Sequence, residues 1–158
     1  MIATTNYVSL FFILFAAIFS RYVIVNIIFH RIFYRRLKER FSERKVVKAD
    51  WKEGQIRLES SYSLITSVIF AASGVAMFWL WEREILKVYT DPAQYGYWYL
   101  PVSFLLILVI QDAYYYWIHR WMHSSRRIYQ LFHRVHHNSI VPSPCFLNAS
   151  PPTESIVQ

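Results

Sequence analysis

Three apolar stretches, each close to the length that a lipid bilayer requires, constrain the fold of this chain more than any other feature. They occupy residues of about 7–29, 62–81 and 97–118, and the second contains no charged side chain. A membrane-spanning helix needs about 20 apolar residues, and in lipid the backbone polar groups must be satisfied within the segment. We therefore predict an all-α fold, a multi-pass transmembrane helical bundle in which residues 1–158 form a single membrane domain.

The composition supports a membrane protein and excludes several other classes. Hydrophobic residues make up 55% of the chain, whereas an ordinary soluble domain shows one apolar stripe per helix rather than long apolar runs. The formal net charge of +7 arises from basic residues beside the apolar stretches. This arrangement favours an anionic membrane surface over a nucleic acid. Cys145 is the single cysteine, which excludes an internal disulfide and a thiolate zinc site.

Basic residues predict the orientation of the three spans. Between His30 and Lys48 the chain contains only two acidic residues, Glu39 and Glu43, against Arg31, Arg35, Arg36, Lys38, Arg40, Arg44, Lys45 and Lys48. The positive-inside tendency places this loop in the cytoplasm. The third span returns the chain to the same side, so the region 119–137 is expected at the cytoplasmic face. The membrane would be the endoplasmic reticulum in a eukaryote or the inner membrane in a bacterium.

Local patterns predict three further features. The polar segment 49–61 indicates a short surface helix before the second span. Small residues within that span predict a face for close helix packing, namely Ala71, Ala72, Ser73, Gly74 and Ala76. After the last histidine the prolines predict an irregular loop, at Pro142, Pro144, Pro151 and Pro152.

Five of the six histidines fall in two groups whose spacing suits metal binding. The groups are His119 with His123, and His133 with His136 and His137. Positions i, i+3 and i+4 share one face of a helix, so each group presents its imidazoles to one side. Neutral imidazole suits iron, zinc and copper, and a metal removes the cost of gathering protonatable rings. We predict that all five are metal ligands on helices at the cytoplasmic face. The alternative is a pH-sensing or merely polar patch at the interface.

Asp112 is a candidate for supporting these ligands. It precedes His119 by seven residues, which places it two helical turns away on the same face. A carboxylate within a span is costly unless it has a partner. We predict that Asp112 accepts a hydrogen bond from a ligand imidazole and orients it. The alternative is a salt bridge to an arginine such as Arg21 or Arg120.

These residues also carry a family resemblance. The stretch DAYYYWIHRWMH over residues 112–123, followed by HRVHHNS over 133–139, resembles the fatty acid hydroxylase and sterol desaturase superfamily. Members are integral-membrane di-iron oxygenases with one His-x3-His box and one His-x2-His-His box. The order, the separation of the boxes and the preceding span agree with the family. Pro152-Thr153-Glu154 also looks like the Pro-x-Glu loop of the family.

The resemblance implies a function in lipid metabolism. It implies two Fe ions, with zinc as a possible substitute, O2 as co-substrate, and no catalytic residue beyond the metal ligands. The reaction would be hydroxylation or desaturation of a C–H bond in a sterol or fatty acyl-type membrane lipid. Electrons would come from an external donor of the cytochrome b5 or ferredoxin type.

The family pattern extends further than this chain does. Its third box, another His-x2-His-His, has no counterpart here, because no histidine follows His137. We therefore expect an amino-terminal fragment or an incomplete gene product, which should hold metal poorly and not turn over. Two other functions stay open: a membrane zinc hydrolase, and a non-catalytic membrane relic of the family.

Overall fold

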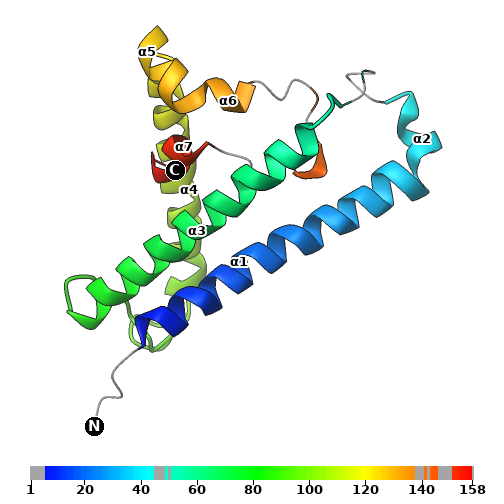
Figure 1. The fold of residues 1–158 in the computed structure, drawn as a ribbon. Coiled ribbons are helices and arrows are strands. Elements are labelled where there is room, and N and C mark those ends of the chain that lie inside the picture. The colour runs from blue at the N-terminus through cyan, green and yellow to red at the C-terminus, as the bar shows by residue number, and fades with distance from the viewer. Residues whose placement is uncertain are drawn as a thin grey trace.

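The computed structural model describes residues 6–44, 49, 51–137, 141, 143–145 and 151–157, and every regular element among them is a helix. Three long helices dominate this part of the chain (Figure 1): α1 (Tyr7–Phe29), α3 (Gln55–Glu82) and α4 (Tyr99–Met122). The shorter elements are the π-helices η1 (His30–Arg36) and η2 (Tyr129–His133), with α2 (Lys38–Ser42), α5 (Arg126–Ile128), α6 (Arg134–His137) and α7 (Pro152–Val157). The predicted all-α fold is confirmed.

A long apolar helix coincides with each of the three predicted spans, and each helical stretch is longer than predicted. α1 continues into η1 and forms an apolar helical stretch of 30 residues, Tyr7–Arg36, while α3 has 28 residues and α4 has 24. At about 1.5 Å per residue even α4 is about 36 Å long, which exceeds the hydrocarbon thickness of about 30 Å. All three are apolar enough to cross a membrane.

α1 and α3 run in opposite directions and pack against each other (Figure 1). A Cβ atom placed on Gly74 would lie 2.9 Å from Cδ1 of Leu14, so the Leu14 side chain would have to shift to admit any side chain at this position. Ala71 on the same side is fully buried. The predicted packing face is therefore confirmed for these two positions. The other small residues of the prediction, Ala72, Ser73 and Ala76, are exposed.

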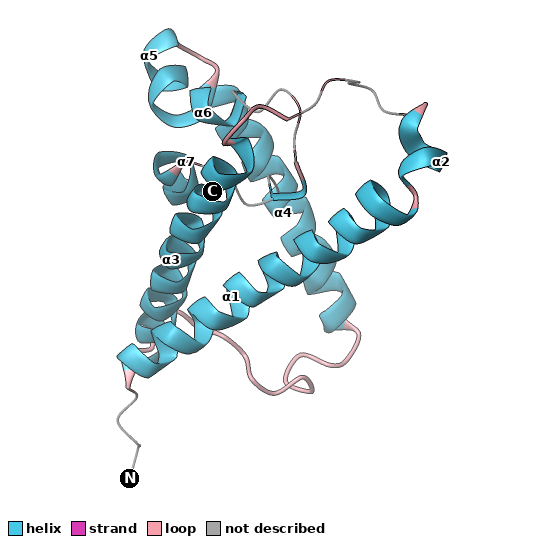
Figure 2. Ribbon diagram, turned by 45° about the vertical axis from the view of Figure 1, so that its right-hand side comes forward, coloured by secondary structure: helices cyan, strands magenta, loops and turns pink. Residues whose placement is uncertain are grey.

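The prediction of a separate surface helix before the second span is wrong. Residues 55–61 form the first turns of α3 itself (Figure 2). One side of α3 is polar and buried, at Gln55, Glu59, Ser63, Thr66 and Ser67. These positions recur at intervals of three or four residues, so they share a face. The face is buried because the C-terminal segment packs on it through α7, a long-range contact that hydropathy does not reveal.

α4 and the C-terminal segment complete the arrangement. Met122, at the last turn of α4, is the only buried residue of that helix. α7 packs between α3 and η2, and η2 also contacts α4. The irregular loop predicted after His137 thus contains a short helix, α7, while residues 138–140, 142 and 146–150 lie outside the described part of the chain.

Candidate metal centre

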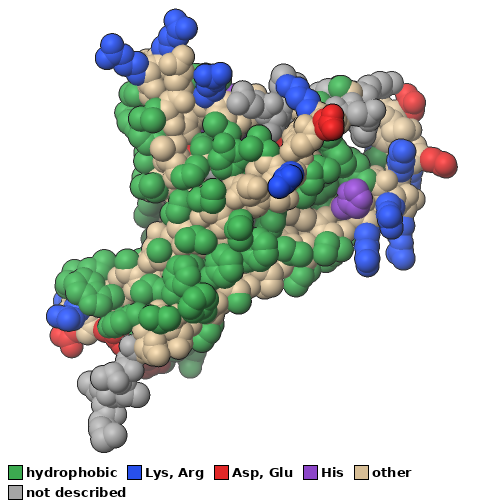
Figure 3. Space-filling view, viewed as in Figure 1, with side chains coloured by type: hydrophobic (Ala, Val, Ile, Leu, Met, Phe, Trp, Pro, Cys, Tyr) green, Lys and Arg blue, Asp and Glu red, His purple; other side chains and the backbone are tan. Residues whose placement is uncertain are grey.

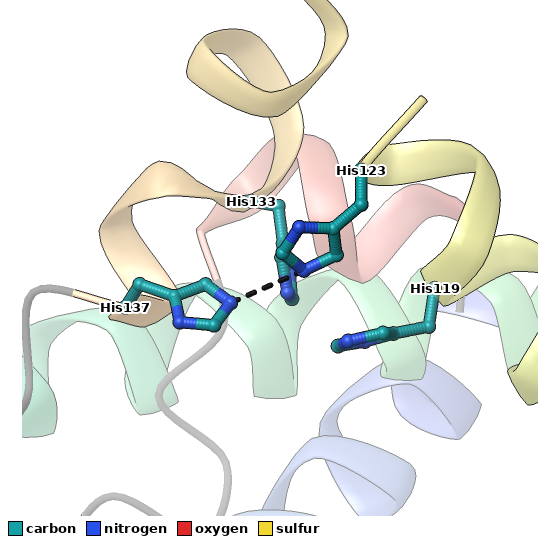
Figure 4. Close-up of side chains that lie close together, drawn as sticks. All are labelled: His119, His123, His133 and His137. Carbon is teal, nitrogen blue, oxygen red and sulfur yellow. Dashed lines mark hydrogen bonds between the residues drawn. The ribbon is translucent and has the colours of Figure 1, made fainter. Parts of the chain in front are cut away.

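Four of the five predicted ligands come together at the end of α4. The ligand nitrogens of His119, His123, His133 and His137 all lie within 4.8 Å of one another. Figure 4 shows the four rings converging: His119 from α4, His123 from the residue that follows α4, His133 from η2 and His137 from α6. The histidines lie in two groups along the sequence, and the fold merges them into one cluster.

A tight reversal of the chain produces this convergence. α4 ends where the His123 amide donates to the carbonyl oxygen of His119 at 3.2 Å. Ser125 then caps the next helix, since its Oγ accepts from the Ile128 amide at 3.3 Å. The returning segment packs on α4 through the rings of Trp121 and Phe132, whose centroids are 5.2 Å apart. The second histidine group therefore faces the first.

His133 occupies the middle of the cluster. Its ring centroid lies 4.5 Å from that of His119, 4.8 Å from that of His123 and 4.6 Å from that of His137. The Nε2 atoms of His123 and His137 are 3.3 Å apart (Figure 4). Two nitrogens bound to one ion, each at about 2.1 Å from it, are at most about 4.2 Å apart. Shifts of less than about 1 Å would therefore bring all four nitrogens around a cation.

A buried carboxylate fixes the orientation of His133. Its Nδ1 lies 3.2 Å from Oε1 of Glu154, and both side chains are 1% exposed. A carboxylate only accepts hydrogen bonds, so Nδ1 carries the proton and Nε2 keeps its lone pair. That Nε2 atom is buried and has no hydrogen-bond partner. A carboxylate behind one ring nitrogen and a metal at the other is the usual arrangement for a histidine ligand. The residues therefore fit a bound cation.

Burial also keeps rings of the second group neutral. It lowers the pKa of His133 to about 3, and the imidazoles around it act in the same direction. Burial, with a smaller contribution from His137, likewise lowers the pKa of His136. A metal binds the neutral imidazole. Near pH 7 these two rings are therefore already in the form that can coordinate.

The two remaining predicted site residues lie outside the cluster of four. His136 lies beside it, with its ring stacked on that of His133 at 5.1 Å and its Nδ1 3.9 Å from Oε1 of Glu154. Asp112 is exposed on α4, and within the described residues it makes no hydrogen bond to a histidine. Its predicted orienting role stays a prediction.

Glu154 is the residue of the site that reasoning from sequence missed. Its sequence signal was the Pro-x-Glu pattern, which was noted as a feature of the family's loop without a role in the site. Two hydrogen bonds position α7, one formed by the residue before Glu154 and one by the residue after it. Thr153 Oγ1 donates to the Leu131 carbonyl at 2.8 Å, and the hydroxyls of Ser155 and Thr66 are 2.8 Å apart. The carboxylate is thereby held between η2 and α3.

Comparison with known proteins agrees with this geometry. The model of the fatty acid hydroxylase family matches residues 104–158. The chain is 31% identical to the lathosterol oxidase of Homo sapiens over 108 residues, which cover 67% of this chain and 36% of that protein. It is 31% identical to the Delta(7)-sterol 5(6)-desaturase ERG3A of Gibberella zeae over 107 residues, 67% of this chain and 30% of the relative. With ERG3B of the same fungus the identity is 39% over 71 residues, 45% of this chain and 22% of the relative.

The site and the comparisons together define the class of protein. It is an integral-membrane protein with a histidine cluster at the end of a span. The chain belongs to the fatty acid hydroxylase and sterol desaturase superfamily. The residues matched by the family model contain the whole histidine cluster and Glu154. The matches span little more than a third, or less, of the length of these curated relatives. No solved structure gives a significant match.

Proposed function

We propose that this chain contributes to an integral-membrane, iron-dependent oxidoreductase that uses O2 to desaturate or hydroxylate a C–H bond of a lipid. The observation that carries the proposal is the gathering of His119, His123 and His137 around the buried His133–Glu154 pair. The names of the relatives, which are sterol desaturases and lathosterol oxidases, make a sterol the first substrate class to test. A fatty acyl lipid is the second.

The metal would be held by the four clustered histidines, with His136 as the fifth predicted ligand. Two Fe ions are proposed, following the family resemblance. Bound iron would supply the redox chemistry that couples O2 to the oxidation of an unactivated C–H bond. The chain itself provides neutral imidazoles that are already oriented. Glu154 holds the proton at Nδ1 of His133 and so presents Nε2 to the metal.

The position of the cluster suits a lipid substrate. His133 and Met122 are buried, so water is excluded from one side of the cluster. His119, His123 and His137 are exposed on the other side. The apolar surface of α4 leads along the same helix towards them, and 0% of its most apolar window is buried. A lipid could therefore reach the exposed side of the cluster directly from the bilayer.

The electron donor and the membrane are part of the same proposal. Arg120, Arg126, Arg127 and Arg134 are all exposed near the cluster. Complementary charge steers association between proteins, so these residues suit an acidic carrier of the cytochrome b5 or ferredoxin type. We place the cluster on the cytoplasmic side, in the endoplasmic reticulum of a eukaryote or the inner membrane of a bacterium.

Iron content and O2 uptake test the proposal on the complete protein in its membrane. We expect bound iron, and O2 uptake that requires both an electron donor and a Delta(7)-sterol. Replacing His119 or His136 by alanine should lower the bound iron at least about tenfold, because each substitution removes a predicted ligand. His30→Ala is the matched control, since His30 is the sixth histidine and lies outside the cluster. Its iron content should be unchanged.

Other outcomes identify the alternatives. Bound zinc, with cleavage of an ester and no O2 uptake, would replace the oxidoreductase by a zinc hydrolase. A protein that binds no metal would be a non-catalytic relic. Equal loss of iron in the His30 and His119 variants would remove the cluster from the metal site.

A further inference from the structure

A cavity of about 390 Å³ lies apart from the histidine cluster. Its walls come from three parts of the chain: the end of α1 with η1, the start of α3 with the residues before it, and residues 143–145. None of the four clustered histidines lines it. Figure 1 shows this junction at the end of α1 that is far from the N-terminus. The metal site does not account for this cavity.

A buried hydrogen-bond network builds one wall of the cavity. Gln55 Nε2 donates to Glu59 Oε1 and to the Val141 carbonyl, each at 2.7 Å. The hydroxyl of Ser143 donates to the other oxygen of Glu59. The carbonyl oxygen of Cys145 accepts from Tyr22 at 3.2 Å. Val141, Ser143 and Cys145 are thus fixed against α1 and α3, so the cavity is a built feature of the fold.

The opposite wall is cationic. Arg31 and Arg35 of η1 both line the cavity, and among the residues that the structure describes no acidic one does. Both side chains are exposed, and neither forms an ion pair with a carboxylate of the described residues. They also line a second hollow, of about 470 Å³, on the neighbouring surface of η1. Figure 3 shows Lys and Arg side chains gathered at this end of the molecule.

The remaining walls combine apolar surface with a buried acceptor. Ile27, Ile56 and Trp51 supply the apolar part. Asn26, which also lines the cavity, is 7% exposed, and its Oδ1 is buried without a hydrogen-bond partner in the described part of the chain. A buried acceptor without a donor is costly. The cavity thus combines two unpaired guanidinium groups, an acceptor in need of a donor, and an apolar side.

We propose that this cavity binds the headgroup of an anionic phospholipid. Arg31 and Arg35 lie in the last turns of the 30-residue span Tyr7–Arg36, where a helix that crosses a bilayer meets the headgroups. Guanidinium groups bind phosphate through paired hydrogen bonds, and basic pockets between membrane helices on the cytoplasmic side bind such lipids. A hydroxyl or ammonium group of the lipid donates to Asn26, and the acyl chains begin along Ile27 and Ile56. Binding at this site involves none of the metal ligands.

Direct binding of a short-chain phosphatidic acid to the complete purified protein tests the site. The comparison is between Arg31→Gln/Arg35→Gln and the matched pair Arg40→Gln/Arg44→Gln. Both pairs remove two positive charges from the same basic segment, but Arg40 and Arg44 do not line the cavity. A basic residue near the membrane contributes about 1 kcal/mol to anionic lipid binding. We therefore expect affinity to fall about 30-fold for the cavity pair and less than about threefold for the control pair.

A further variant and further ligands identify the bound molecule and keep the test decisive if the arginine variant does not fold. Ile56→Trp fills the cavity without changing charge and should also weaken binding, so it decides the question if the arginine variant does not fold. Phosphatidylcholine of the same chain length and inorganic phosphate should both bind more weakly than phosphatidic acid.

Equal losses in the two arginine pairs would overturn the proposal in favour of a diffuse basic surface. Inorganic phosphate binding as tightly as the lipid would overturn the lipid as ligand. Iron content and turnover do not enter this test, so its outcome is separate from that of the proposed oxidoreductase.

Discussion

The two sides of the histidine cluster are supported very differently. His133 and Glu154 belong to η2 and α7, and α7 packs on the polar face of α3. Both side chains are 1% exposed. His119 lies in the last turn of α4 and His123 is its C-cap residue, and α4 has a single buried residue, Met122. They are exposed, as is His137. One side of the site is therefore embedded in packed structure, and the other lies on a helix with little support.

Because of this difference, one side of the cluster orients the imidazole rings and the other side leaves access for a substrate. Rings held by packing and by a carboxylate can keep one geometry without a metal, because the hydrogen bond fixes both the tautomer and the ring plane. Exposed rings lack that restraint but leave room for a substrate or for further ligands. We infer that the side on α3 sets the geometry of the site. The side on α4 supplies the approach to it.

The strongest test of this asymmetry is the removal of a carboxylate from each side. Glu154→Gln keeps the size of the side chain but no longer forces the proton of His133 onto Nδ1. Loss of a carboxylate behind a ligand imidazole lowers metal affinity by about 10- to 100-fold. We expect this loss in a Co²⁺ titration of the purified protein, with the metal as an optical probe.

Asp112→Asn is the matched control, because it makes the same carboxylate-to-amide change on α4, where the side chain is exposed. We expect its affinity for Co²⁺ to stay within about twofold of the unmodified protein. Equal losses in the two variants would contradict the asymmetry. They would also support the orienting role predicted for Asp112 from the sequence.

A second test compares the packing of α3 with that of α4. Gly74→Leu places a side chain where a Cβ alone would lie 2.9 Å from Leu14. Overpacking of this kind costs about 1–3 kcal/mol, so we expect a loss of about 2 kcal/mol in the free energy of unfolding. Ala113→Leu adds a comparable side chain to the exposed surface of α4 and should change stability by less than about 0.5 kcal/mol.

Unfolding in a denaturing detergent measures both variants, and Leu14→Ala supplies the internal check. Combined with Gly74→Leu, it should recover part of the lost stability, because the two positions are in contact. A double variant whose losses simply add would show that the two helices do not meet at this point.

The sequence predicted the features that depend on local composition. Hydropathy is a property of each segment, so the three spans followed from it with errors only at their ends. The spacing of the histidines identified all four histidines of the cluster. Gly74 and Ala71 were predicted to pack because small residues are a local signal for close approach.

Features that depend on distant contacts were not predictable in the same way. Gln55 and Glu59, at the polar start of α3, form hydrogen bonds with residues more than 80 positions later. A hydropathy plot registers only that these two residues are polar. Glu154 is 21 residues from His133 in the sequence, so no helical spacing connects the two. His136 shares the spacing of the second group, yet it lies beside the cluster of four, stacked on His133, and spacing alone does not distinguish it from His137.

The smallest expected effect is a dependence of stability on pH that arises from His133 on the embedded side. Burial lowers the pKa of His133 from 6.5 to about 3 in the folded protein. Between these two pH values the unfolded chain binds a proton that the folded chain does not, so metal-free protein loses stability as the pH falls below about 6.5. From pH 7 to pH 6 the loss from this residue is at most about 0.7 kcal/mol.

His133→Gln should reduce the pH dependence by that amount in thermal unfolding measured with a chelator present. Gln130→Ala, an exposed substitution on the same π-helix, should leave it unchanged. Identical pH profiles for His133→Gln and the unmodified protein would show that the ring is not held neutral by its burial.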